Sequence, residues 1–230
     1  QWVSIDVAEA SDAGTLQSSQ TEVCAGLNGG DVDVVNHVGQ VAHWQYKTSG
    51  STWVDVNVQN EHLSFSDIDE ETTYRVVVKN KFCDADTSES LVMKVSTRAK
   101  GGSITGDSEA CVGVGSSNLK LNNYSGIIRS WESSTSAVGN WSDLGVSTEN
   151  LILDNTGATM FYRVAVVNGV CPVEYSAVFQ HVIFPKTLAG KITGGKEVCA
   201  GENNGILELT DYNGEILGWE IQDESGVWFD

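Results

Sequence analysis

The stretch Tyr162-Arg163-Val164-Ala165-Val166 repeats, 88 residues later, the stretch Tyr74-Arg75-Val76-Val77-Val78. β-branched and aromatic residues dominate both stretches, and such residues favour β-strands. Two closely similar strands at a fixed spacing indicate that the chain is built from repeated units. Residues that recur in every unit are explained first by what each unit needs in order to fold.

A cysteine motif and two sets of tryptophans keep the same period. Cys-x-Gly begins at residues 24, 111 and 199, which are 87 and 88 residues apart. The first and second tryptophans of each unit follow it; they are Trp44, Trp131 and Trp219, and then Trp53, Trp141 and Trp228. Because both sets recur in strands, we expect both to be buried anchors of a core.

Alternation with a period of two runs through each unit. Val32 and Val34 of the first unit enclose Asp33, and the equivalent residues of the other units alternate in the same way. Such alternation predicts strands with one buried face. Six or seven short strands in about 88 residues predict an all-β fold, namely tandem immunoglobulin-like antiparallel β-sandwich repeats in an extended array. The expected core residues are Trp44, Trp131, Trp219, Tyr74 and Tyr162.

Alignment of the repeated residues divides the chain into four parts. Residues 11–99 and 100–187 are whole units, residues 1–10 match the last strand of a preceding unit, and residues 188–230 match the first half of a further unit. Half a sandwich leaves an open apolar face and unpaired edges, so it is not expected to be stable alone. We expect the sequence to be a slice of a longer array with short links between its units.

The composition disfavours several classes of function. The chain has 230 residues, with 31 acidic against 13 basic ones and a net charge of −18. This charge disfavours nucleic acid as a partner, because phosphate binding needs a basic face, and an anionic membrane surface repels it. No apolar stretch approaches the roughly 18 residues of a membrane span, so membrane insertion is not expected.

The five cysteines indicate one disulfide for each unit. Cys24 and Cys83 are 59 residues apart and Cys111 and Cys171 are 60 apart, while Cys199 begins a pair whose second member lies past the end. We therefore predict the bridges Cys24–Cys83 and Cys111–Cys171, which indicate an oxidising compartment. Spacing alone does not prove that the partners lie within one unit. A Cα separation above about 7 Å would exclude the first pair.

Three stretches carry a resemblance to a known family. They are Gly-Ile-Ile-Arg-Ser-Trp-Glu-Ser-Ser (126–134), Tyr-Arg-Val-Ala-Val-Val-Asn-Gly-Val-Cys-Pro-Val-Glu-Tyr-Ser (162–176) and Gly-Lys-Ile-Thr-Gly-Gly-Lys-Glu-Val-Cys-Ala-Gly (190–201). They resemble the repeats of giant cell-surface adhesins of Bacteroidota, most of all those of the SprB-type gliding-motility adhesins. The resemblance covers essentially the whole chain. It implies an immunoglobulin-like fold, export by the type 9 secretion system and a place outside the outer membrane, and it carries over no catalytic residue.

Few residues offer chemistry. None of the four histidines recurs from unit to unit, and no nucleophile motif such as Gly-x-Ser-x-Gly occurs, so we do not expect an enzyme or a cofactor. His181 is expected to be a hydrogen-bonded core residue. Asp67, Asp69 and Glu70 are weak candidates for calcium ligands, because calcium prefers carboxylate oxygens. The second unit lacks these carboxylates, and solvated loop acids are the alternative.

These observations predict a non-enzymatic stalk segment of a long secreted cell-surface adhesin, for surface adhesion and gliding motility. Its expected location is extracellular, at the outer face of the outer membrane. Its expected partners are the neighbouring repeats of the same chain, and then surface polysaccharide or other cell-surface proteins. The alternatives are spacer or polysaccharide-binding modules of a secreted carbohydrate-active enzyme, and a surface filament protein.

Overall fold

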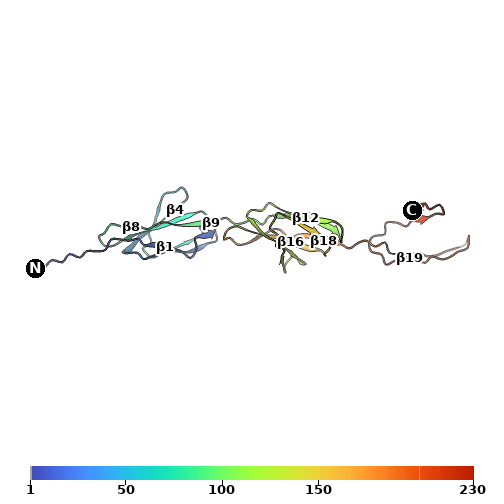
Figure 1. Cartoon of the computed structure of the whole chain (residues 1–230), viewed down its shortest axis with the longest axis horizontal. Helices are drawn as coiled ribbons and strands as arrows, with labels where there is room; N and C mark the ends of the chain where they lie inside the picture. The colour runs from blue at the N-terminus through green and yellow to red at the C-terminus, as the bar shows by residue number, and fades with distance from the viewer. Residues whose placement is uncertain (1, 202) are drawn as a thin grey trace.

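The computed structural model describes residues 2–201 and 203–230. Strands and their connecting loops make up these residues, and no helix occurs among them. Two complete β-sandwiches follow one another along the long axis of the molecule, and a third segment of two short hairpins lies beyond them (Figure 1). The prediction of an all-β tandem array is therefore confirmed.

The first repeat is a sandwich of two sheets. Its strands are β1 (Thr15–Gln17), β2 (Glu22–Cys24), β3 (Gly29–Val35), β4 (Gln40–Thr48), β5 (Val54–Val56), β6 (His62–Ser66), β7 (Thr72–Lys79), β8 (Asp86–Thr87) and β9 (Leu91–Ser96). One sheet has the order β1-β3-β6, and the other has the order β2-β9-β7-β4-β5 with β8 also pairing with β7.

The second repeat has the same architecture. Its strands are β10 (Ser103–Gly106), β11 (Glu109–Cys111), β12 (Ser116–Asn122), β13 (Ile127–Ser134), β14 (Ser142–Asp143), β15 (Asn150–Asp154), β16 (Met160–Val167), β17 (Glu174–Tyr175) and β18 (Phe179–Phe184). The sheet orders are β10-β12-β15 and β11-β18-β16-β13-β14, with β17 beside β16. Two facing and mainly antiparallel sheets with this split are typical of immunoglobulin-like sandwiches.

The first edge of each repeat is divided between the two sheets. In the first repeat β1 pairs with β3, and the chain then crosses so that β2 pairs with β9 in the other sheet. The β2–β9 pairing is parallel, as is the equivalent pairing of β11 with β18. Since β9 is the last strand, β2 runs in the same direction, toward the next repeat. This direction decides where the first cysteine of each repeat lies.

A tryptophan fills the centre of each sandwich. Trp44 and Trp131 have no exposed surface, and their indole N–H groups each donate a 2.8 Å hydrogen bond, to the carbonyl oxygens of Asn60 and Thr148. Such a partner removes the cost of burying the indole N–H. Side chains from both sheets surround the tryptophans; among them are Val32, Tyr74, Val76, Val78, Leu119, Leu121, Tyr162, Val164 and Val166.

His181 is the one buried histidine among the described residues, at 2% exposure. One ring nitrogen lies 2.8 Å from the carbonyl oxygen of Asp107 and the other lies 3.2 Å from Oδ1 of Asn155. Both nitrogens therefore have partners, as expected for a histidine that replaces an apolar core residue. In the first repeat the equivalent residue is the buried Met93.

The second tryptophans are not core anchors, contrary to the prediction. Trp53 lies beneath the Lys47 ammonium and the Arg75 guanidinium, at 4.9 and 3.9 Å from the ring centroid. Trp141 lies 4.4 Å from the Arg163 guanidinium. Both rings are only partly buried and pack on the outer face of a sheet. Because side chains alternate along a strand, Arg75 and Arg163 point away from the core, and the tryptophans stack on them there.

The third segment does not form a sandwich. It contains the hairpins β19 (Lys191–Thr193) with β20 (Glu208–Thr210), and β21 (Ile221–Gln222) with β22 (Trp228–Phe229). Trp219 is 47% exposed, so its prediction as a core residue is wrong for this structure. The later strands that cover Trp44 and Trp131 have no counterpart in this segment, and an indole cannot be buried by one layer alone.

The first residues form no strand, although their register with β9 predicted one. Residues 2–10 are irregular and largely exposed. A strand needs a hydrogen-bonding partner, and in this structure no neighbouring strand lies beside them.

No helix of a length and apolarity that could span a membrane occurs in the described part of the chain.

The two tryptophan positions of the second repeat predict different costs of truncation. We expect Trp131→Ala to lower the free energy of unfolding by about 3–5 kcal/mol, because it leaves a large cavity in the core. The matched variant Trp141→Ala removes a partly exposed ring and a cation–π contact, so about 1 kcal/mol is expected. Urea unfolding of the oxidised chain measures both, and equal losses would contradict the assignment of Trp131 alone to the core.

Candidate functional site: the joint between the repeats

The Cys-x-Gly motif forms a turn at the far end of its repeat. The Leu27 N–H donates a 3.2 Å hydrogen bond to the Cys24 carbonyl oxygen, and Gly26 has a φ of +64°. A turn of this kind favours glycine at its third position, because a side chain there is strained. Cys24 lies beside Ser96, the last residue of β9, in the parallel register. Cys24 therefore stands where the first repeat meets the second.

A second turn presents the other cysteine at the near end of its repeat. In the second repeat this turn is Asn168-Gly169-Val170-Cys171, closed by a 3.0 Å hydrogen bond from the Cys171 N–H to the Asn168 carbonyl oxygen. It follows β16, which runs antiparallel to β18 and so ends next to the first repeat. Gly169, with a φ of +50°, is at the position of the turn that requires the left-handed region.

A disulfide joins the two repeats. It connects Cys24 of the first repeat to Cys171 of the second, with a Cα–Cα distance of 4.8 Å and a sequence separation of 147 residues. The predicted pairs Cys24–Cys83 and Cys111–Cys171 are therefore wrong. The reason is that the two cysteines of one repeat lie at opposite ends of the sandwich. Cys83, Cys111 and Cys199 are free thiols in this structure.

Hydrogen bonds complete the contact between the Cys171 turn and the first repeat. The Asn168 side-chain amide donates to the carbonyl oxygen of Thr97 at 2.8 Å and to its hydroxyl oxygen at 3.0 Å. Gly169 lies so close to Ser96 that a Cβ there would fall 1.8 Å from the Ser96 Oγ. The Ser96 hydroxyl in turn donates to the Glu22 carboxylate of β2.

The polypeptide link across the joint is short. Ala99 is only 8% exposed and belongs to the core cluster of the second repeat. The Lys100 N–H donates a 2.8 Å hydrogen bond to the Ser125 carbonyl oxygen of the same repeat. Only Thr97 and Arg98 thus lie between the last strand of the first repeat and residues packed on the second. A link of two residues next to a disulfide leaves the two sandwiches little freedom to bend.

Asn28 fixes the Cys24 end of the joint from within the first repeat. Its side-chain amide donates to the carbonyl oxygens of Cys24 and Ile68, at 2.8 and 2.7 Å. Its Oδ1 accepts a 3.0 Å hydrogen bond from the Ile68 N–H. The turn that carries Cys24 is therefore tied to the loop between β6 and β7. Asn28 was not singled out by the sequence, and its position four residues after the cysteine is the signal that could have found it.

The calcium candidates lie in the same loop, and the Asp69 carboxylate is close to the turn that carries Cys24, since a Cβ on Gly26 would fall 3.2 Å from its Oδ1. Asp67, Asp69 and Glu70 connect β6 to β7. Across residues 2–201 and 203–230, no three His, Cys, Asp or Glu side chains are grouped so that they could hold a metal ion. Asp67 has a φ of +51° and its N–H donates a 3.0 Å hydrogen bond to the Asn28 carbonyl oxygen, which is turn geometry. The structure therefore places these three carboxylates in one loop without clustering them.

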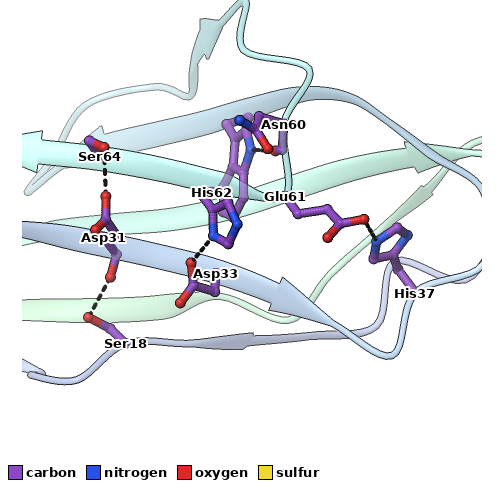
Figure 2. Close-up of polar contacts among 9 residues, drawn as sticks. Ser18, Asp31, Asp33, His37, Asn60, Glu61, His62 and Ser64 are labelled. Atoms are coloured by element: carbon purple, nitrogen blue, oxygen red, sulfur yellow. Dashed lines mark hydrogen bonds and ion pairs between the residues drawn. The ribbon is translucent and has the colours of Figure 1, made fainter.

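A polar ladder covers the exposed face of β3 and β6 (Figure 2). His62 Nδ1 lies 2.5 Å from a carboxylate oxygen of Asp33, and the Ser64 hydroxyl donates a 2.6 Å hydrogen bond to Asp31. His37 Nε2 lies 3.3 Å from the Glu61 carboxylate nearby. The hydrogen bond to Asp33 raises the pKa of His62 above its ordinary value, with a smaller contribution from the negative charge of Glu61 and Asp31. These contacts are solvent-exposed and belong to the first repeat alone.

The fold and the joint define a tandem immunoglobulin-like repeat protein whose repeats are linked by a disulfide. A family model described as a domain of unknown function (DUF8696) matches residues 12–97 and again residues 100–184. The chain therefore belongs to this family, with one copy in each sandwich. No curated protein matches the sequence. Among solved structures, the FN1–FN3 domains of chicken CNTN1 are similar at 9% identity and a TM-score of 0.32, over 79% of this chain and 70% of that one.

The close approach of Gly169 to Ser96 makes a prediction about the strength of the joint. Gly169→Ala places a methyl group against Ser96, so we expect dithiothreitol to reduce the Cys24–Cys171 bond faster than in the parent chain. Gly145→Ala is the matched control, because Gly145 also has a positive φ, +66°, but has open space around it. The double change Gly169→Ala with Ser96→Ala removes the obstructing hydroxyl but leaves the Glu22 carboxylate at 2.7 Å and the residue 96 Cβ at 2.8 Å from the new methyl group, so it is expected to slow reduction only in part. Equal reduction rates for Gly169→Ala and Gly145→Ala would contradict this role.

The His62–Asp33 pair makes a prediction about pH. Because the pKa of His62 is higher in the folded chain than its ordinary value of 6.5, the pair stabilises the fold fully below pH 6.5. This stabilisation is lost as the pH rises through the folded pKa of His62. Asp33→Asn removes the hydrogen-bonding carboxylate, and the NMR titration of the His62 ring is then expected to move back toward 6.5. An unchanged titration in Asp33→Asn would overturn this assignment of cause.

Proposed function

We propose that this chain is a non-enzymatic stalk segment of a long cell-surface adhesin that acts in surface attachment and gliding motility. The observation that carries the proposal is the Cys24–Cys171 bond, which joins successive repeats and not the two sheets of one repeat. Such a bond adds nothing to the core of either sandwich, but it fixes the position of each relative to the other. A fixed, extended shape is what a stalk needs in order to hold a binding region away from a cell.

The bond also changes the route that tension takes along the array. The two sulfur atoms connect residues 147 positions apart, so the chain from Cys24 to Cys171 lies outside the shortest covalent route. This bypassed chain includes every strand from β3 to β16, which contains most of both cores. Tension therefore reaches the disulfide before it reaches those strands. A gliding adhesin transmits force between the cell and the substratum, and this arrangement suits that task.

The chemistry of the joint supports a location outside the cell. Disulfides form and persist in oxidising compartments such as the cell exterior. The net charge of −18 keeps neighbouring stalks apart by mutual repulsion. The resemblance to Bacteroidota adhesins adds export by the type 9 secretion system and a place at the outer face of the outer membrane. The neighbouring repeats are the first partners, and surface polysaccharide or another cell-surface protein is the proposed ligand of the whole adhesin.

Single-molecule pulling on the two ends of the chain tests the mechanical part of this proposal. With the bond intact, the fully extended length is expected to be shorter by about 500 Å than after reduction, because the 147 residues of the loop do not extend. Cys171→Ser is expected to give the longer extended length even without reductant. Cys111→Ser leaves the bond in place and is expected to give the shorter extended length. Unfolding of both cores at low force with the bond intact would exclude the load-bearing role.

Antibodies test the place and role of the protein on the cell. We expect an antibody raised against residues 12–184 to label intact cells, and its monovalent fragments to reduce attachment and gliding. Labelling that requires permeabilised cells would contradict a surface location. Surface labelling without any effect of saturating fragments on attachment or gliding would leave the stalk on the surface but remove the adhesin role.

A further inference from the structure

The two ends of the first repeat carry the same joint chemistry. Residues 9–12 lie against the first repeat as residues 97–100 lie against the second. Asp12 and Val38 exchange backbone hydrogen bonds of 3.1 and 2.8 Å, and Lys100 and Ser125 exchange equivalent bonds of 2.8 and 3.0 Å. The Asn80 side-chain amide donates to the Glu9 carbonyl oxygen at 3.0 Å, as Asn168 does to Thr97 at 2.8 Å. The near end of the first repeat therefore holds residues 9–12 in the way that the second repeat holds the link from the repeat before it.

Cys83 occupies the position at the near end of the first repeat that Cys171 occupies at the near end of the second. Its turn is closed by a 2.9 Å hydrogen bond from the Cys83 N–H to the Asn80 carbonyl oxygen, and Lys81 has a φ of +49°. The Cys83 Sγ lies 3.1 Å from the Glu9 carbonyl oxygen, and the Cys171 Sγ lies 3.3 Å from that of Ser96. Cys171 is bonded in this structure, and Cys83 lies against the incoming chain at a position one residue further along, since Glu9 is the counterpart of Thr97.

Cys111 provides the opposite half of the same joint at the far end of the second repeat. It lies beside Phe184, the last residue of β18, in a parallel register, as Cys24 lies beside Ser96. The Val114 N–H donates a 3.2 Å hydrogen bond to the Cys111 carbonyl oxygen, which repeats the turn at Cys24. The side chain of Cys111 is exposed.

We infer that Cys83 and Cys111 are sites of the same inter-repeat disulfide, each bonded to the complementary cysteine of a further copy of this repeat. Cys83 takes the cysteine of a Cys-x-Gly turn, and Cys111 takes a cysteine from a turn like that of Cys171. Every repeat is then bonded to both of its neighbours. The inference rests on the joint and does not depend on a role in adhesion.

Each bond forms by thiol–disulfide exchange with an oxidant, for which a thiol oxidoreductase in its disulfide form is the chemical class required. One cysteine thiolate attacks the oxidant disulfide and forms a mixed disulfide with it. The thiolate of the neighbouring repeat then displaces the oxidant sulfur. The two cysteine thiols lose two protons and two electrons, and the oxidant leaves as a dithiol.

The bonds overlap along the chain, because the Cys24–Cys171 loop contains both Cys83 and Cys111. The shortest covalent path along the array then alternates between disulfides and short stretches of main chain. One such stretch runs from Cys83 to Cys111 and another from Cys171 to Cys199, and each spans 28 residues. Fully extended, 28 residues span at most about 100 Å. Two such covalent paths run side by side along the array, so the array would be nearly inextensible while its disulfides remain closed.

Disulfide mapping of the polypeptide purified from its source tests the inference. Free thiols are blocked with N-ethylmaleimide before digestion, and linked peptides are identified by mass spectrometry without reduction. The expected result is that Cys24 is linked to Cys171 and that Cys83 and Cys111 are not labelled by N-ethylmaleimide. Cys83 is expected to be linked to the cysteine of a Cys-x-Gly turn, and Cys111 to a cysteine in a turn like that of Cys171. A Cys83–Cys24 or Cys111–Cys171 linkage, or full labelling of Cys83 and Cys111, would overturn it.

Electrophoresis without reductant distinguishes the two sources of the further repeat. A polypeptide that migrates as a single chain has its partners within itself, and one that migrates as a ladder is bonded to other copies; both results support the inference when the mapped pairs are complementary. The recombinant 230-residue chain gives the matched control. Cys83→Ser is expected to keep the Cys24–Cys171 bond, and Cys171→Ser is expected to leave Cys24 free and not bonded to Cys83. Formation of a Cys24–Cys83 bond in the Cys171→Ser chain would contradict the opposite-end placement on which the inference depends.

Discussion

The direction of β2 is the constraint on which the rest of the structure depends. Because β2 pairs in parallel with the last strand, it carries Cys24 to the far end of the first repeat. The second cysteine follows β7, which runs antiparallel to β9 and ends at the near end. The two thiols of one repeat are thus separated by the length of the sandwich. Each can meet only a neighbour, so the cysteines act between repeats.

The joint combines a short link, a covalent bond and a specific hydrogen bond. Closing a loop of 147 residues stabilises the folded state by about 5 kcal/mol in the chain-entropy model of disulfides. Both sandwiches lie partly within this loop, so an unfolded repeat remains confined as long as its neighbour stays folded. The Asn168 amide then selects one orientation, because it requires the Thr97 carbonyl oxygen at hydrogen-bonding distance. Stability and shape therefore arise at the same place.

Local patterns predicted the strands and the central tryptophans, whereas the disulfide pairing was beyond them. Successive side chains of a strand point to opposite faces, so the local pattern around Val32 and Val34 is enough to indicate a buried face. The pairing depends on strand direction across the sheet. A shift of one period relates the Cys24–Cys83 and Cys24–Cys171 schemes, so spacing cannot separate them. Arg163 alternates with core residues, so its place on the outer face was predictable, whereas the contact of Trp141 with it depends on how the strands pair. Trp219 depends on a second sheet that its segment does not form.

The differences between the two repeats indicate where the function of an array resides. The polar ladder around His62 and Asp33 is confined to the first repeat, since Asn150 and Lys120 take these places in the second. A property of every repeat cannot depend on such a cluster. The Asn80 and Asn168 contacts, in contrast, occur at the near end of both sandwiches. The joint is therefore shared by both repeats, whereas the exposed face of β3 and β6 differs between them and is used by neither the core nor the joint.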